Sequence, residues 1–303
     1  MNDVALIFIY NHQYNANIER LEAIYSTRFS HIFHLVPFYL GDKENVIPVY
    51  ENSYYFQGYL AQGFRTFYNN RFKHYIFIAD DLILNPLIDE NNYKDHFKLD
   101  DVTCFIPNLI PLSELMYWNW MSSATGFSLK GQGVELQSQL PKYEDAAARF
   151  KKHGISIKPL VFDQLFYKKN LNFRSRLSDV FDVIKFKIKK RKLKDKVFDL
   201  PYPLVSSYSD LCVISADIIG RFCHFCGLFA SSSLFVEIGL PTSLALTAEK
   251  IVQEKDLDLQ GTGLWNEEDW ELVKKYRSNL KSLLADFPEK LYIHPIKLSQ
   301  WNK

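Results

Sequence analysis

The sequence predicts an α/β protein with a mixed, mostly parallel sheet flanked by helices, because two patterns typical of such proteins open the chain. Residues 4–10 form a continuous apolar run rather than an alternating one, as expected for a strand that is covered on both faces. Apolar residues at helical spacing then run from Ile18 to Tyr25, and a second apolar run covers residues 31–38. The chain therefore starts with a strand, a helix and a second strand.

The same patterns continue downstream. A helix is expected over residues 55–69, and a buried strand over 75–78 runs into the adjacent acids Asp80 and Asp81. Ligands of open α/β sheets bind at the carboxyl ends of strands, so this acidic pair marks the first place to look for a site. The remaining elements are expected as strands over 102–106 and 210–214, an extended segment over 156–162, and helices over 143–152 and 218–246.

Composition places the chain among globular proteins. Apolar residues make up 47% and charged residues 23% of 303, with 12 glycines and 12 prolines, which excludes disordered and collagen-like classes. A net charge of +1 gives no basic bias for a nucleic-acid partner. The start lacks a secretory pattern, and no window offers about 18 uninterrupted apolar residues. We expect a cytoplasmic protein with a single domain over residues 1–303.

One segment within that domain, residues 174–200, is expected to be a basic helical insertion. Residues 185–196 hold eight Lys or Arg and one Asp. An apolar stripe recurs along the segment at helical spacing, formed by Leu177, Phe181, Ile184 and Ile188. Three roles stay open: contact with an anionic membrane, at the inner face of the plasma membrane and near a lipid-linked acceptor; binding of an anionic glycan; or packing of the stripe on the domain with solvated charges.

The adjacent aspartates carry the clearest chemical signal. Ionised carboxylates behind four apolar residues are unfavourable unless they are paired, hydrogen-bonded or bound to a cation. Two oxygen ligands suit Mg²⁺ or Mn²⁺, which bind through one or two carboxylates together with phosphate oxygens of a substrate. Alternatively, the pair caps a turn, because Asp is frequent where strands end.

The context of this pair resembles the GT-A glycosyltransferases, which are nucleotide-sugar-dependent enzymes built on a Rossmann-like sheet. Four short landmarks occur in the family's order over almost the whole chain: Ala79-Asp80-Asp81, Tyr208-Ser209-Asp210, Glu237 in LFVEIGLPT and His294 in IHPIK. Ala79 takes the first position of the usual Asp-x-Asp motif. The resemblance therefore implies Asp81 as the metal ligand and Asp80 as a contact to the ribose of the donor.

The resemblance also implies roles for the other landmarks. Sugar transfer leaves a diphosphate whose growing charge needs a metal, Lys or Arg. The resemblance implies that His294 is a metal ligand together with Asp81, or contacts the diphosphate, and that Lys297 contacts the same anion. Glu237 would be the general base for the acceptor hydroxyl, which implies inversion at the anomeric carbon. Asp210 would hold acceptor hydroxyls. The structural alternatives are a buried Glu satisfied by backbone donors, an Asp that caps a turn, and a surface His and Lys near the C-terminus.

In the first half of the chain, Tyr10 and Asn11 follow the first strand, where the family places contacts to the nucleotide base. An aromatic face and an amide would fit a uracil-like ring, although Asn is also common in ordinary turns. Gln57 and Gly58 open the helix before the acidic strand, in a region that lines the donor pocket of similar enzymes.

The resemblance thus implies a metal-dependent, inverting glycosyltransferase that moves a sugar from a nucleoside diphosphate sugar to a saccharide acceptor in the assembly of a bacterial surface polysaccharide. A nucleotidyltransferase is an alternative, but the chain lacks the Gly-rich basic loop that such enzymes carry near the N-terminus. A non-catalytic carbohydrate-binding or scaffolding protein with structural acids is another. The G-x-S-x-G, P-loop and G-x-G-x-x-G motifs of hydrolases, kinases and dinucleotide enzymes do not occur.

The sequence Cys223-His224-Phe225-Cys226 invites comparison with zinc sites. A structural zinc site needs four ligands, and no second Cys or His pair stands at a suitable spacing. We therefore expect buried thiols in an apolar helix.

Overall fold

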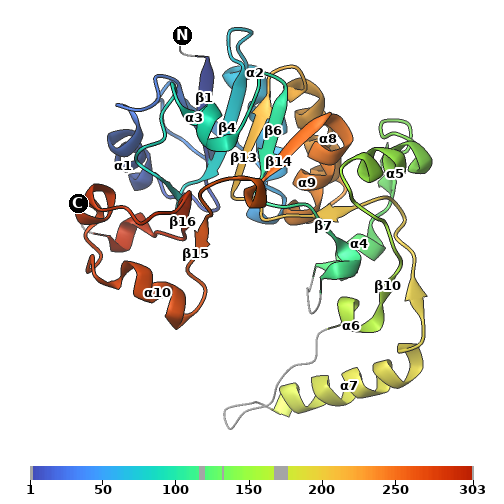
Figure 1. Ribbon diagram of the computed structural model, residues 1–303. Helices are drawn as coiled ribbons and strands as arrows, with labels where there is room; N and C mark the ends of the chain where they lie inside the picture. Colours follow the sequence, from blue (N-terminus) through green and yellow to red (C-terminus); the bar gives the residue numbers. More distant parts are fainter. Residues whose placement is uncertain (1–2, 116–119, 132, 167–176, 302–303) are drawn as a thin grey trace.

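The core of the protein is a seven-stranded, mostly parallel sheet with helices on both faces, as the computed structural model shows for residues 3–115, 120–131, 133–166 and 177–301 (Figure 1). The expected α/β class is therefore confirmed, and the sheet is compatible with a Rossmann-like fold. β13 is antiparallel to both of its neighbours, and every other adjacent pair is parallel. The strands in spatial order are β14 (Lys250–Gln253), β6 (Thr103–Ile106), β13 (Leu211–Ser215), β4 (His74–Ala79), β1 (Val4–Ile9), β2 (Ile32–Pro37) and β3 (Val46–Val49).

The continuous apolar run of β1 is explained by two cores, one on each face of the sheet. Side chains alternate between faces along a strand, so Ile7 joins one core while Leu6 and Phe8 join the other. Leu6 lies opposite Ile76 of β4 and Ile32 of β2. A strand covered on both sides needs apolar residues at every position.

Each core is closed by its own helices. The core around Ile7 contains side chains of α2 (Gln57–Phe67), α5 (Tyr143–Lys152), α8 (Ile219–Ser231) and α9 (Val236–Thr247). The core around Leu6 contains side chains of α1 (Ala16–Tyr25), α3 (Tyr93–Phe97), α10 (Glu267–Lys274) and α11 (Leu280–Ala285).

Most expected elements are present within a few residues of their expected bounds, but two segments differ. The helical region expected over 218–246 is two helices, because Ser233 adopts a left-handed backbone angle, φ 58°, that ends the first one. The extended segment expected over 156–162 contains only the two-residue strand β10 (Leu160–Val161), and α6 (Phe162–Leu165) follows at once.

Two smaller sheets lie at the carboxyl edge of the main sheet. One joins β5 (Ile83–Leu84), β16 (Tyr292–His294) and β15 (Thr262–Gly263), which brings the C-terminal segment to the end of β4. In the other, β7 (Ile110–Pro111) pairs with β12 (Val205–Ser206). The remaining pairs are β8 (Lys130–Gly131) with β9 (Val134–Glu135), and β10 with β11 (Val197–Phe198). The described residues also form the short 3₁₀ helices η1 (Ser53–Tyr55), η2 (Leu112–Glu114), η3 (Glu254–Asp256) and η4 (Leu298–Gln300).

Between β7 and β12 the chain contributes α5 to the core around Ile7, and it also forms α4 (Met121–Gly126), α6 and α7 (Leu177–Leu193). α4 and α6 continue this core away from the sheet through Met121, Ala124 and Leu165. α7 is the expected basic helix, and it extends along the far side of these two helices from the sheet (Figure 1). In the described parts of the chain, no helix combines the length and apolar character that a membrane crossing requires.

The four cysteines are free and buried, as expected for thiols in a core. Cys223 and Cys226 lie in α8, Cys212 in β13 and Cys104 in β6.

The close approach of α2 to α8 gives a stability prediction. A Cβ on Gly58 would lie 2.9 Å from the Cβ of Ala230 in α8, so a larger side chain forces the two helices apart. Gly58→Leu should lower the free energy of unfolding by about 1–3 kcal/mol in a denaturant titration. Thr66→Leu, on the exposed face of the same helix, is the matched control and should change it by less than about 0.5 kcal/mol. Equal values for the two variants would contradict the tight contact.

Candidate functional site

The candidate site lies where the order of the sheet strands reverses. From β1 the chain adds β2 and β3 on one side and then crosses to place β4 on the other side. Ligands of open α/β sheets bind at the carboxyl ends of the strands beside such a reversal. Asn11 follows β1 and the pair Asp80 and Asp81 follows β4, and the Asp80 N–H donates to the Ile9 carbonyl (3.0 Å). The sheet therefore brings these polar residues together.

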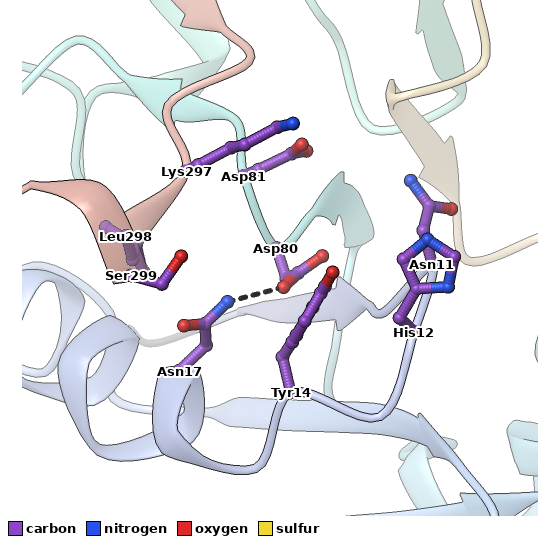
Figure 2. A pocket seen from close by; sticks show the side chains of 9 residues that line it. All are labelled: Asn11, His12, Tyr14, Asn17, Asp80, Asp81, Lys297, Leu298 and Ser299. Atoms are coloured by element: carbon purple, nitrogen blue, oxygen red, sulfur yellow. Dashed lines mark hydrogen bonds between the residues drawn. The ribbon is translucent and has the colours of Figure 1, made fainter.

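A cavity of about 170 Å³ opens at this point (Figure 2). Four of its lining residues were predicted from the sequence: Asn11, Asp80, Asp81 and Lys297. Asp81 and the exposed Lys297 extend in the same direction from neighbouring backbones (Figure 2). The lining residues that sequence reasoning missed are His12, Tyr14, Asn17, Leu298 and Ser299.

Asp80 forms the floor of the cavity. Its side chain is 3% exposed, and the Asn17 amide donates to its Oδ2 at 2.7 Å, as the dashed line in Figure 2 shows. Burial, reinforced by the charge of Asp81, raises the pKa of Asp80 to about 7. A cation or a hydroxyl donor in the cavity would favour the ionised form of this carboxyl.

Asp81 is connected to the C-terminal strand by a chain of hydrogen bonds. His294 Nε2 lies 3.0 Å from Asp81 Oδ1, and the Tyr208 hydroxyl lies 3.1 Å from His294 Nδ1. Although burial lowers the pKa of His294, the hydrogen bond with Asp81 and the charge of Asp210 raise it above its ordinary value. The link between Asp81 and His294 is an ion pair when the imidazole is protonated.

Two further acids, Asp210 and Glu237, lie beside this chain but are not among the residues that line the cavity. Asp210 is fixed to the end of β4, because its carbonyl accepts from the Ala79 N–H at 2.9 Å. Burial raises the pKa of Asp210, while the charge of His294 opposes that rise. Glu237 lies in the first turn of α9. Its backbone carbonyl accepts a hydrogen bond from the Ser207 N–H (3.0 Å).

Glu237 carries a buried carboxyl oxygen, Oε2, without a hydrogen-bond partner among the described residues. Burial and the charge of Asp210 raise the pKa of Glu237 to about 8. The expected alternative, in which backbone donors satisfy this carboxyl, therefore does not hold for Oε2. A buried acceptor without a partner is unfavourable unless a ligand supplies a donor.

Three residues expected on the donor side lie in the interior instead. The Tyr10 ring is fully buried, and its hydroxyl hydrogen-bonds His34 Nδ1 at 2.9 Å, so it offers no face to a nucleotide base. Gln57 is also buried, and its Nε2 donates to the Leu234 carbonyl at 2.8 Å, which fixes the turn before α9. Gly58 packs against α8. Their roles in the structure are packing roles.

Trp265 is a further candidate that the sequence pattern did not single out. Its ring is 61% exposed and lies edge-on to Tyr208 and His294, with ring centres 5.9 and 5.5 Å away. The ring lies so close over Gly263 that a Cβ there would be 2.1 Å from the indole Nε1. Its backbone N–H donates to Asp269 Oδ2 at 2.9 Å. The protein thus holds a large flat side chain in solvent beside the acid cluster.

A divalent cation fits the donor set at the cavity. Among the described residues no group of three or more His, Cys, Asp and Glu is arranged as a complete metal site. Asp80 and Asp81, however, present carboxylate oxygens to the cavity, and Mg²⁺ and Mn²⁺ commonly complete their shells with water and substrate phosphate. The site therefore suits a cation that arrives with a phosphate ligand better than a permanently enclosed one.

Comparison with known proteins gives no family for this chain. No protein-family model matches it, and no curated protein matches its sequence.

The raised pKa of Glu237 gives a pH-dependent stability prediction. The folded protein holds this proton up to about pH 8, whereas an unfolded Glu loses it near its ordinary value of 4.5, so stability from this group falls as pH rises through that window. Glu237→Gln should match the wild-type melting temperature at pH 4 and exceed it at pH 9. The exposed Glu289→Gln is the control and should show no such divergence. Parallel pH profiles for wild type and Glu237→Gln would contradict the raised pKa.

Proposed function

We propose that the protein is a glycosyltransferase that moves a sugar from a nucleoside diphosphate sugar to a saccharide acceptor. The observation that carries this proposal is the pair Asp80 and Asp81 facing one cavity with Lys297 at the reversal of strand order. Carboxylates for a cation and a lysine for an anion are the groups that a diphosphate requires. Glu237, whose Oε2 is buried beside this cluster, supplies the base that a transfer to a hydroxyl requires.

The donor occupies the cavity in this proposal. Lys297 contacts the diphosphate, and Asp80 accepts from a ribose hydroxyl. Asn11 with the exposed ring of Tyr14 takes the base, the role that the sequence pattern gave to Asn11 and Tyr10. Tyr14 is 50% exposed and lies edge-on to His12, so it offers the free aromatic face that Tyr10 lacks.

Asp81, with Asp80 beside it, would hold the divalent cation, Mn²⁺ or Mg²⁺. Bound there, such an ion neutralises charge on the departing diphosphate. His294, which the resemblance made a metal ligand, would instead support Asp81, because both of its ring nitrogens have partners. His294 orients Asp81 through the 3.0 Å hydrogen bond, and Tyr208 in turn orients the imidazole.

The transfer itself uses Glu237. Its carboxylate takes the proton of the acceptor hydroxyl while that oxygen forms a bond to the anomeric carbon. The bond from this carbon to the diphosphate oxygen breaks, and its electron pair leaves with the nucleoside diphosphate. Attack opposite the leaving group inverts the configuration. Because the pKa of Glu237 is about 8, the fraction of active base, and with it the rate, rises as the pH approaches 8.

Trp265 provides a platform for the acceptor. Sugar rings present apolar C–H faces that pack on flat aromatic side chains, while their hydroxyls need polar partners. The exposed indole lies beside Tyr208, and the neighbouring Asp210 offers a carboxyl to sugar hydroxyls. This arrangement favours a saccharide over an apolar acceptor.

Nucleotide binding tests the donor site. In a thermal-shift panel with Mn²⁺, a nucleoside diphosphate at about 100 times its Kd should stabilise the wild type by about 2.7 kcal/mol. Asp81→Asn should abolish the shift, because it removes the charge that holds the cation. Glu237→Gln should keep the shift and reduce sugar transfer by about 10²–10⁴-fold, because the base is lost while the cavity is intact.

Asp42→Asn, at an exposed turn, is the control and should behave as the wild type in both measurements. The absence of a shift with any nucleotide would reject the donor site and favour a carbohydrate-binding or scaffolding protein. Release of pyrophosphate from a nucleoside triphosphate would instead identify a nucleotidyltransferase.

The acceptor platform is tested by separating the two substrates. Trp265→Ala should raise the KM for the saccharide acceptor about ten-fold, equivalent to about 1.4 kcal/mol, and leave the KM for the donor unchanged. Trp270→Ala, a half-exposed tryptophan in α10, is the matched control and should change neither constant. If Trp265→Ala raised both constants equally, the indole would have a general structural role instead.

A further inference from the structure

The outward face of α7 carries four exposed apolar side chains. Val180, Phe181, Ile184 and Ile188 are 39%, 62%, 47% and 53% exposed. Their spacing places them along one face of the helix, because residues three, four and seven apart share a face. Three of them belong to the stripe expected from the sequence, and the side chain of its fourth member, Leu177, lies outside the described residues. A row of this kind is unusual on a helix that only faces water.

A different face of α7 packs on the rest of the protein. Val183 is buried, and the Phe186 ring lies edge-on to Phe162 with ring centres 5.4 Å apart. Lys190 forms an ion pair with Asp163 at 2.7 Å. These contacts fix the rotation of the helix about its axis and leave the stripe outside. The expectation that the stripe packs on the domain is therefore wrong, because Val183 and Phe186 make that contact.

The exposed row is bordered by positive charge. At 100° per residue, Lys187 and Arg191 lie on the side of Val180, next to Phe181, Ile184 and Ile188, and Lys185 and Lys192 lie on the opposite side of these three residues. All four cations are exposed, and the segment 185–196 holds eight Lys or Arg against one Asp. Apolar side chains in the acyl boundary, with flanking Lys and Arg at the phosphates, are how interfacial helices bind anionic lipid.

The charge of α7 favours an anionic lipid surface over a second copy of the chain or an anionic glycan as the partner of the apolar row. A second copy of the chain would bring another strongly basic helix against the first, which is unfavourable. An anionic glycan would neutralise the lysines but leave Phe181 and Ile184 in water. An anionic lipid surface satisfies both the apolar row and the charges that border it.

We propose that α7 docks the protein on an anionic membrane surface, with Phe181, Ile184 and Ile188 in the acyl boundary. α7 lies on the side of the sheet toward which β1 and β4 run, the side that carries the candidate site (Figure 1). Docking therefore turns the site toward the membrane, where a lipid-linked saccharide would be presented. The inference depends on α7 alone and stands whether or not the proposed activity is correct.

Vesicle flotation of the full chain tests the proposal. The wild type should float with vesicles of phosphatidylcholine and phosphatidylglycerol at low salt, float less as salt is added, and stay behind with phosphatidylcholine alone. The triple variant Phe181→Gln, Ile184→Gln, Ile188→Gln should lose about ten-fold or more in vesicle partitioning. A quadruple variant of the bordering cations should lose at least as much: Lys185→Gln, Lys187→Gln, Arg191→Gln and Lys192→Gln.

Two matched controls change the same number of residues at other exposed positions. Four lysines are replaced by Gln in the first (142, 151, 152 and 158), and three scattered apolar residues are replaced by Gln in the second (Leu40, Leu87 and Val102). Both should partition within about two-fold of the wild type, since singly exposed apolar residues do not form a binding surface. Circular dichroism confirms that each variant is folded.

Three results would overturn the proposal. The first is equal flotation of the wild type and both α7 variants. The second is a wild-type dimer in light scattering that the apolar variant lacks, without vesicle binding, which would assign the row to a second copy. The third is binding to a sulfated polysaccharide, but not to vesicles, that depends on the cations and not on the apolar row.

Discussion

The hydrogen bond between Asp81 and His294 joins the carboxyl end of the central strand β4 to the last strand of the described chain, and the site depends on it. A backbone bond from the Ile296 N–H to the Asp81 carbonyl (2.6 Å) and the pairing of β16 with β5 strengthen the same connection. Together they hold the C-terminal segment across the edge of the sheet. The same connection places Lys297 at the cavity that the two aspartates line, and Tyr208 extends it toward β13.

Three acids at this edge have raised pKa values for the same two reasons. Burial is the first cause that raises the pKa of Asp80, Asp210 and Glu237, and a neighbouring carboxylate raises each of them further. Ionising one of these groups makes it harder to ionise the next. A cation near Asp80 or a hydroxyl near Glu237 relieves part of that repulsion. The cluster is therefore built to respond to ligands that carry positive charge or donate hydrogen bonds.

The sequence predicts the interior of the sheet better than its borders. Strands covered on both faces are continuous apolar runs. The edge strand β3 is interrupted by Pro48, a residue that argues against a strand, and the edge strand β14 is polar at both ends. In the site, residue type and position after a strand were enough to find Asp80 and Asp81. Tyr10 follows the first strand in the same way, but its hydroxyl hydrogen-bonds the buried His34, which is 24 residues away in the sequence, so its position after the strand did not indicate its role. Trp265 gains its position from contacts with distant strands, which no local pattern encodes.

The antiparallel direction of β13 has a consequence for how the chain is threaded. Because β6 and β13 are antiparallel, β6 ends and β13 begins at the same edge of the sheet. β7, which follows β6, pairs there with β12, which precedes β13. The described residues between these two strands include α4, α5, α6 and α7, and α5 packs against α9 in the core around Ile7. The part of this portion that holds α7 can therefore change in length without altering the order of the strands. α5 cannot be exchanged in the same way, because Ala146 and Phe150 fill the core beneath the sheet.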